Sequence, residues 1–192
     1  VLAGFIFQYI NERKIEESSD IATEMQQAYF RWINADDVTE KDRQLDLFHD
    51  ARTIAEKRYT KLYTGRLAGF LHAQVMYNQR KFSDAAVMFN SLIQKPEEAD
   101  HISSMSAMNA AVAFEQAGDI DAAIQAYKKV FSDFGSVSPD APRALFSVGR
   151  LLEERSSADA IEAYEQLINE YPVSDWLGMA ENRIIFLQTL GE

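Results

Sequence analysis

Apolar residues recur with helical spacing along almost the whole chain. One face of a long helix is expected before residue 34, because apolar residues follow in steps of four and three: Ile21, Met25, Ala28 and Trp32. Residues 34–41 are mostly polar and interrupt this pattern, and a second helix is predicted over residues 40–62. Its expected inner face comprises Leu47, Phe48, Ala51, Ile54, Ala55 and Leu62. Because no segment alternates apolar and polar residues as a strand does, the pattern predicts an all-α fold.

The first ten residues, VLAGFIFQYI, are apolar on every side, and a strongly polar stretch follows them. A membrane-spanning helix needs about 20 apolar residues. Residues 1–10 are therefore expected to form the exit half of such a helix, with its first half ahead of Val1. A long N-terminal helix, residues 1–33, would then start in a membrane. Arg13 and Lys14 favour the cytoplasmic side for the residues that follow the membrane segment. The rule compares the charges on both flanks of a segment, however, so these two residues alone leave its orientation open. The alternative is that residues 1–10 pack against the domain or against another copy of the chain.

Small residues recur with a nearly constant period after residue 70. Ala73, Ala111 and Gly149 are 38 residues apart, and a second series follows at intervals of 38 and 37: Ala85, Ala123 and Ala160. An aromatic residue comes four positions after each member of the second series: Phe89, Tyr127 and Tyr164. Two facing small residues let two antiparallel helices approach closely, and the aromatic side chain fills the space towards the next pair. The chain is therefore expected to contain three repeated helical hairpins.

This arrangement resembles the tetratricopeptide repeat. The third copy carries the family's pattern in order, with one residue deleted at the turn: Leu145, Val148, Gly149, Leu152, Ala160, Tyr164 and Pro172. The tryptophan of the family's pattern is missing from every copy. The resemblance covers residues 67–189 as three repeats with a capping helix at 174–189, after a divergent first hairpin at 34–66. It implies an α-solenoid of stacked antiparallel helix hairpins.

The repeat length of 37–38 residues is similar to that of tetratricopeptide proteins of the bacterial cell envelope. This resemblance implies a protein that is anchored in the inner membrane and faces the periplasm, with the cytoplasmic side as the alternative. Its expected partners are components of envelope assembly or of secretion.

The charge of the chain bears on the kind of partner. Its 192 residues include 30 Asp and Glu against 19 Lys and Arg, and no cysteine. The net charge of −11 argues against nucleic-acid binding, because phosphate repels such a surface. Residues 57–83 are the exception, with six Lys or Arg and no acid. These cations are expected either to balance acidic neighbours or to dock an acidic partner or anionic lipid headgroups.

Enzyme signatures are missing from the sequence: it contains no glycine-rich phosphate loop, no G-x-S-x-G and no H-E-x-x-H. The three histidines lack metal-ligand spacing, and His72, on the interior face of a hairpin, is expected to be a neutral core histidine. Asp119, Ser83 and Ser157 are expected to cap helix N-termini. The acidic pair at 153 and 154 is expected to lie in solvent. The sequence thus predicts no catalytic residue, no metal and no cofactor.

In tetratricopeptide proteins the second, fifth, ninth and twelfth positions of each repeat line a concave groove. The resemblance therefore implies partner-binding residues Leu67, Phe70, Gln74, Tyr77, Met105, Met108, Val112, Arg143, Phe146 and Arg150. This lining is mostly apolar, which suits the helix or peptide of a protein partner. Its two arginines are expected either to pair with a carboxylate of the partner or to fix the partner's direction. The chain is thus expected to be a membrane-anchored adaptor. The alternative is a structural module that homo-oligomerises through its N-terminal helix and groove.

Overall fold

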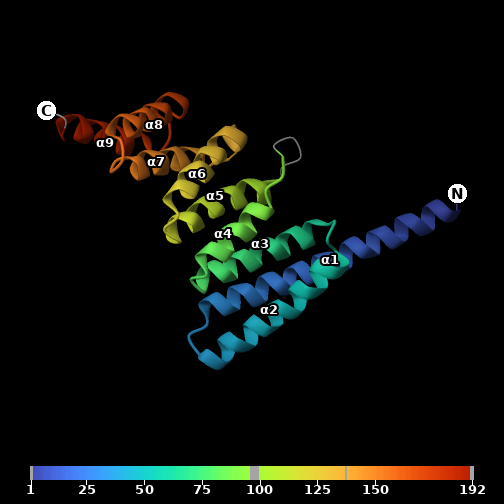
Figure 1. Ribbon diagram of the computed structural model, residues 1–192. Helices are drawn as coiled ribbons and strands as arrows, with labels where there is room; N and C mark the ends of the chain where they lie inside the picture. Colours follow the sequence, from blue (N-terminus) through green and yellow to red (C-terminus); the bar gives the residue numbers. More distant parts are fainter. Residues whose placement is uncertain (1, 96–99, 137, 191–192) are drawn as a thin grey trace. The chain divides into compact units, whose positions relative to one another are not determined.

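The computed structural model describes residues 2–95, 100–136 and 138–190, and within these ranges the chain forms nine α-helices and no strand (Figure 1). The helices are α1 (Leu2–Asn34), α2 (Val38–Arg58), α3 (Tyr63–Asn78), α4 (Phe82–Ser91), α5 (His101–Gln116), α6 (Ile120–Phe134), α7 (Ala141–Leu152), α8 (Ser157–Glu170) and α9 (Leu177–Leu190). The predicted all-α fold is confirmed, and Val1 lies outside the described residues. The chain divides into two compact units, unit 1 (Val1–Lys81) with α1 to α3 and unit 2 (Phe82–Glu192) with α4 to α9. This division falls between the two helices of the first predicted repeat.

Unit 1 is built on the hairpin of α1 and α2, with α3 packed against both helices. Asp37 ends the short connection between α1 and α2, because its carboxylate accepts the N–H of Glu40 at 2.8 Å and caps α2. Aromatic side chains fill the interface, where the rings of Tyr29 and Phe48 lie 6.4 Å apart. At the start of α3, the buried hydroxyl of Thr64 donates to a backbone carbonyl of α1 at 3.0 Å. The opening hairpin is thus α1 with α2, and residues 34–66 contain only one complete helix.

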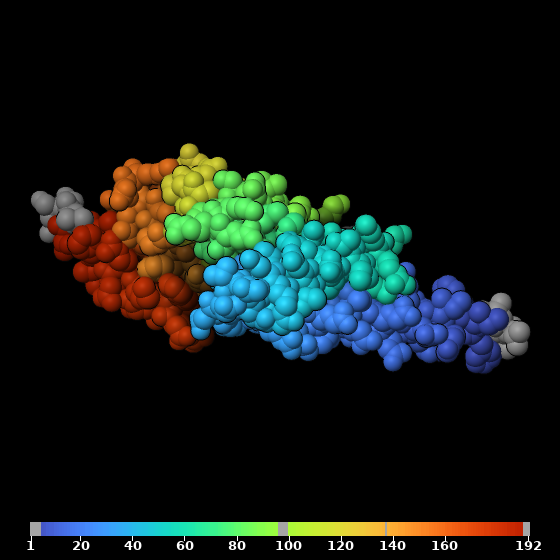
Figure 2. Space-filling view, turned by 90° about the horizontal axis from the view of Figure 1, so that it is seen from below, coloured from blue at the N-terminus to red at the C-terminus, as the bar shows by residue number. Residues whose placement is uncertain are grey.

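The N-terminal turns of α1 extend beyond α2 and α3 (Figures 1 and 2). Their described side chains are largely exposed, including Phe5 at 68% and Phe7 at 74%. Residues 5–10 therefore do not pack into unit 1, which differs from the predicted alternative that this segment packs against its own domain. Among the described helices, none is both long enough and apolar enough to cross a membrane.

The buried face of α2 differs from the prediction. The helix ends at Arg58 rather than at residue 62, and Leu62 is the N-cap residue of α3. Leu47 and Ile54 are 45% and 37% exposed. Phe48, Ala51 and Ala55 of the predicted face are buried, and Gln44 is buried with them. Packing against α1 and α3 thus leaves Leu47 and Ile54 at the edge of the buried stripe.

Unit 2 is a row of helices, from α4 to α9, in which each packs against the next. The small residues predicted at the hairpin contacts are buried in this unit: Ala85, Ala111, Ala123, Gly149 and Ala160. Gly149 shows the reason most clearly, because a Cβ added to it would lie 2.5 Å from the ring of Tyr164. The predicted close approach of the two helices is confirmed at this hairpin, and α9 lies at the position of the predicted capping helix.

Of the three predicted helix caps, one is confirmed. Asp119 accepts the N–H of Ala122 at 3.1 Å and caps α6. At α8 the cap is Ser156, whose extended backbone (φ −158°, ψ 104°) precedes the first helical residue. The prediction of Ser157 is therefore one residue late. The prediction of Ser83 is wrong, because α4 begins one residue before it and Ser83 lies inside the helix.

His72 lies in a half-buried polar contact between α2 and α3. Its Nδ1 is 3.3 Å from Nη1 of Arg52, and its ring centroid is 6.1 Å from that of His49. Burial, reinforced by the nearby charge of Arg52, lowers the pKa of His72 below its ordinary value of 6.5. A lowered pKa favours the neutral imidazole near pH 7, in agreement with the prediction, but His72 is half-buried rather than part of the core.

Candidate partner-binding surfaces

The predicted groove residues divide between the two units. Leu67, Phe70, Gln74 and Tyr77 lie on α3 in unit 1. The other six lie on α5 and α7 in unit 2: Met105, Met108, Val112, Arg143, Phe146 and Arg150. On α3 the two apolar residues at 67 and 70 are buried, whereas Gln74 and Tyr77 are half-buried. Leu67 and Phe70 are thus core residues, which differs from the expected open lining.

In unit 2 the fifth position of each repeat is also a core position. Met108 is buried in an apolar cluster that includes Tyr127. Phe146 is buried because two rings cover it, Tyr164 with its centroid at 5.4 Å and Trp176 at 5.0 Å. Neither side chain can reach a partner while its repeat stays packed. The expectation that Met108 and Phe146 line an open groove is therefore corrected.

Part of the predicted lining in unit 2 remains accessible on α5 and α7. Met105 is 39% exposed and Val112 is half-buried, and their spacing of seven residues places both on one side of the helix. Arg143 occupies the position of Met105 in the next repeat and is exposed. We call Met105 and Val112 of α5, together with Arg143 of α7, the α5 face. It comprises two apolar side chains and one cation.

Arg150 is engaged within the protein itself. Its Nη2 donates to both carboxylate oxygens of Glu115 at 2.7 Å, and the hydroxyl of Tyr127 donates to Glu115 Oε2 at 2.9 Å. Burial, together with the charge of Glu115, raises the pKa of Tyr127, so its hydroxyl stays a proton donor. Three helices, α5, α6 and α7, meet at this one carboxylate. Arg150 therefore joins two repeats. The prediction that it would pair with a carboxylate of a partner differs from this internal ion pair.

Glu153 makes an equivalent joint one repeat further on. It accepts the hydroxyl of Tyr164 at 2.5 Å, Nε of Arg183 at 2.8 Å and Nη2 of the same arginine. Burial acts to raise the pKa of Glu153, but the hydrogen bonds from Arg183 and Tyr164 outweigh burial and leave this pKa below its ordinary value of 4.5. The prediction that Glu153 lies in solvent is therefore wrong. We call each of these clusters a Glu–Tyr–Arg joint.

The sequence does carry a signal for these joints. Glu115 and Glu153 are 38 residues apart, which is the period of the small residues, and each precedes the tyrosine of its own repeat. In the first repeat the equivalent positions hold Tyr77 and Phe89, so the pattern starts only with the second copy.

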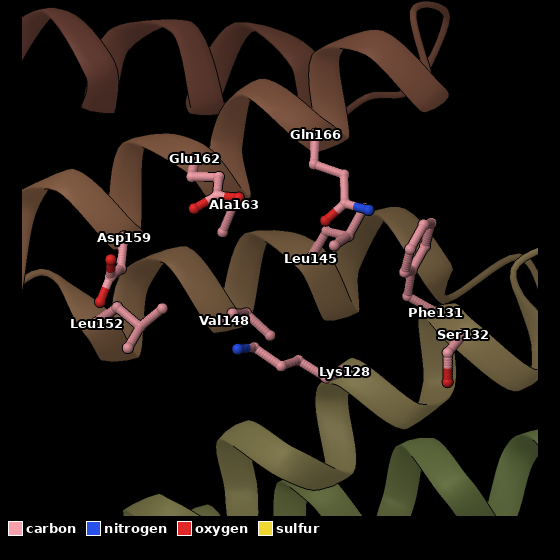
Figure 3. A pocket seen from close by; sticks show the side chains of 10 residues that line it. All are labelled: Lys128, Phe131, Ser132, Leu145, Val148, Leu152, Asp159, Glu162, Ala163 and Gln166. Carbon is pink, nitrogen blue, oxygen red and sulfur yellow. The ribbon is translucent and has the colours of Figure 1, made fainter.

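Unit 2 also contains a pocket of about 540 Å³ formed by α6, α7 and α8, which sequence reasoning missed (Figure 3). Its lining comprises Lys128, Phe131 and Ser132 of α6, Leu145, Val148 and Leu152 of α7, and Asp159, Glu162, Ala163 and Gln166 of α8. The close-up shows polar side chains of α6 and α8 standing around apolar side chains of α7. A pocket of this size accommodates a few side chains of a peptide.

Both surfaces of unit 2 combine apolar contact with charge, which is what an amphipathic peptide requires. Among the residues that the structure describes, no three His, Asp or Glu side chains come together as ligands for a metal ion.

Comparison with known proteins identifies the repeat. Residues 70–130 and 108–175 each match the tetratricopeptide repeat, and the two overlapping matches together cover more than half of the 192 residues. No curated protein matches the chain. The matched residues contain α5 to α8 in full, the helices that carry the small residues of the second and third copies. The chain therefore belongs to the tetratricopeptide repeat family, whose repeats serve as scaffolds that bind protein partners.

Proposed function

We propose that the chain is a non-enzymatic adaptor of the bacterial cell envelope that holds a helix or extended peptide of a protein partner on unit 2. The observation that carries this proposal is the α5 face. Met105 is 39% exposed and Val112 is half-buried on the same side of α5, whereas Met108 and Phe146 are buried. The exposed Arg143 holds the position of Met105 in the next repeat. Methionine suits such a surface because its flexible side chain adapts to varied apolar partners.

The second part of the proposal is that α1 attaches the adaptor to a membrane. Its support is the exposed apolar character of Phe5, Ile6, Phe7, Tyr9 and Ile10. The repeat length of 37–38 residues supports an envelope location. We place the protein at the inner membrane, facing the periplasm, with components of envelope assembly or secretion as its partners.

The docking surface can be tested with a random peptide library displayed on phage and selected on the whole chain. We expect selected peptides to bind the unaltered chain and to lose at least tenfold in affinity with Met105→Glu, because a carboxylate then meets their apolar side chains. Val87→Glu is the matched control, since Val87 is also an exposed apolar residue on a helix of unit 2. Gln166→Trp, which fills the α6–α8 pocket, is the second comparison.

Each variant has a separate consequence for the proposal. Loss of binding with Met105→Glu alone supports docking on the α5 face. Loss with Gln166→Trp alone contradicts that location and moves the site to the pocket. Equal losses with Met105→Glu and Val87→Glu would show that any added negative charge weakens binding, which contradicts a specific site. Met108→Glu is unsuitable for this test, because Met108 is in the core.

A second candidate function is self-assembly, in which α1 and the α5 face bind another copy of the chain. The exposed Phe5 and Phe7 favour it, because apolar helix ends also associate with each other. Light scattering coupled to size exclusion separates the two functions. A mass that falls to that of one chain in Met105→Glu indicates self-assembly, and an unchanged mass together with lost peptide binding indicates the adaptor.

A further inference from the structure

The apolar start of α1 ends at a group of cations that come from two helices. Phe5, Ile6, Phe7, Tyr9 and Ile10 are each more than half exposed, and they point to different sides of the helix. The first basic residues, Arg13 and Lys14, follow within one turn. Figure 2 shows the end of α1 standing clear of the rest of unit 1. The helix therefore changes from apolar to cationic over a few ångströms along its axis.

A hollow of about 560 Å³ lies where α1 passes the end of α2. Its lining is Tyr9, Ile10, Arg13, Lys14 and Glu17 from α1, with Arg58 and Tyr59 from the end of α2. Three cations and one carboxylate thus converge on one cavity from positions more than 40 residues apart in the chain. Lys57 and Lys61, beside Arg58 and Tyr59 in the sequence, are exposed as well.

Glu17 does not neutralise this hollow. Its carboxylate lies 3.9 Å from Nη2 of Arg13 and 3.8 Å from Nη2 of Arg58, and it also accepts the hydroxyl of Tyr59 at 3.4 Å. These contacts are long, and the side chains of the two arginines are 62% and 66% exposed, so each ion pair is weak. The hollow therefore keeps a net positive charge. An anion bound there would be attracted by all three cations.

The position of the cations indicates the source of that anion. A membrane presents anionic headgroups directly beside an apolar phase, and this segment of α1 has the same order along its axis. From Ile10 to Arg13 and Lys14 the helix rises about 5 Å, which is comparable with the headgroup layer on one side of a bilayer. Tyr9 and Tyr59 line the hollow at the boundary, where amphipathic rings are favoured. An acidic protein surface would account for the cations but not for the apolar turns beside them.

We propose that the hollow formed by Arg13, Lys14 and Arg58 binds anionic phospholipid headgroups when the start of α1 is inserted in a bilayer. This inference rests on the proposed membrane attachment and gives it a lipid preference. Each basic residue near an anionic surface strengthens binding about fivefold, so three give an increase on the order of a hundredfold. The attraction falls as salt screens the charges.

The test is flotation of the whole chain with two kinds of vesicle, phosphatidylcholine alone and phosphatidylcholine with about 30% phosphatidylglycerol. We expect binding to both, through α1, and at least tenfold tighter binding to the anionic vesicles at low salt. The variant Arg13→Gln/Lys14→Gln/Arg58→Gln is expected to bind phosphatidylcholine vesicles as the unaltered chain does. It is expected to lose the gain, that is, the tighter binding to anionic vesicles. The control Lys128→Gln/Lys129→Gln/Arg155→Gln removes the same charge from unit 2 and is expected to keep the gain. Circular dichroism checks that both variants remain helical.

The outcomes separate the inference from the function on which it rests. Equal binding of the unaltered chain to both vesicles overturns the headgroup site and leaves the membrane attachment standing. No binding to either vesicle overturns both. A gain that the control variant also loses shows that net charge, rather than this hollow, is responsible, and overturns the site. Displacement of the chain from anionic vesicles by soluble oligoglutamate, but not by inorganic phosphate, would overturn it in favour of an acidic protein partner.

Discussion

The α5–α6 and α7–α8 hairpins share one residue pattern, but their facing small residues are 12 positions apart in the first and 11 in the second. Because α7 ends earlier in this pattern, residues 153–156 connect α7 to α8, whereas only residues 117–119 connect α5 to α6. In the α5–α6 turn Gly118 has φ of +81°, and the N–H groups of Gly118 and Asp119 donate to carbonyls in the last turns of α5. In the α7–α8 turn the N–H of Ser156 donates to the carbonyl of Leu152, and Ser156 itself caps α8. No described residue of the α7–α8 turn has positive φ, so this hairpin reverses the chain without a left-handed residue.

The α7–α8 hairpin has the closer contact between its helices. Ala111 of the α5–α6 hairpin accommodates its methyl group in the same buried cluster as Tyr127. At the equivalent Gly149 a methyl group would lie 2.5 Å from the ring of Tyr164. The spacing from the small residue to the tyrosine is 16 residues in the first hairpin and 15 in the second. The α5–α6 hairpin thus accommodates alanine at this position, whereas the α7–α8 hairpin requires glycine.

What both hairpins retain is the Glu–Tyr–Arg joint. Glu115 and Glu153 each accept a tyrosine hydroxyl from their own hairpin and a guanidinium from a later helix. The arginine follows its glutamate by 35 residues in the first case and by 30 in the second. The joint therefore depends on where the next helix lies, and it survives a change in hairpin geometry.

The largest difference between the hairpins should appear on exchanging their small residues. Gly149→Ala is expected to lower the free energy of unfolding by about 1–3 kcal/mol, because the new methyl group forces Tyr164 away. Ala111→Gly should cost only about 0.5–1 kcal/mol, the usual cost of glycine within a helix. Urea denaturation followed by the fluorescence of Trp176, with Trp32 replaced by Phe, measures both in unit 2.

A double substitution provides the control for this exchange. In a Tyr164→Leu background the clash is relieved, so Gly149→Ala should become neutral or stabilising through the higher helix propensity of alanine. A persistent cost of Gly149→Ala in that background would contradict contact with Tyr164 as its cause.

The two joints are expected to differ in strength. Glu153→Gln should lower the free energy of unfolding by about 1–2 kcal/mol, since charged hydrogen bonds to Tyr164 and Arg183 are weakened. Glu115→Gln should cost less, because the side chain of Arg150 is more exposed than that of Arg183, 43% against 36%, and water replaces its partner more readily. A cycle with Arg183→Gln isolates the pairwise energy. Equal costs for the two glutamates would show that solvent exposure does not rank the joints.

A side chain at the position of Gly118 should strain the turn between α5 and α6. Gly118→Ala is expected to cost about 1 kcal/mol, because an alanine at φ of +81° is strained although nothing lies within 4 Å of its Cβ. Gly178→Ala is the matched control, since it also has open space around its Cβ but lies in α9 without positive φ. It should be neutral or slightly stabilising. Thermal unfolding curves compare the stability of the two variants. Equal losses of stability would contradict backbone strain as the cause of the cost of Gly118→Ala.

Much of the fold could be predicted because it is encoded locally. The sequence signals used for the prediction are spacings between nearby residues: the period of 38 and 37 residues, and the aromatic residue four positions after each alanine. What spacing could not select was the stripe of α2 that becomes buried, because Leu47 and Gln44 are both compatible with a helix and α1 and α3 decide between them.

The candidate site was less predictable because burial comes from distant residues. Phe146 fits a groove position by the repeat pattern, but Trp176, 30 residues later, covers it. Arg150 looks available for a ligand until α7 packs beside α5 and Glu115 binds it. Position in the repeat thus predicted which helix carries each residue, and only the packing of the following helix determined which residues remain accessible.

The smallest expected effect is the pH dependence of the second joint. The pKa of Glu153 is lower in the folded protein than its ordinary value of 4.5, so the unfolded chain binds more protons near that pH. The free energy of unfolding of unit 2 should therefore fall as pH drops below about 4.5, and Glu153→Gln should reduce that fall. Arg43 and Gln44 lower the pKa of Glu40 to about 2, which acts in the same sense but in unit 1. Following Trp176 alone separates the two units, and an unchanged acid dependence in Glu153→Gln would show that the carboxylate of Glu153 does not carry it.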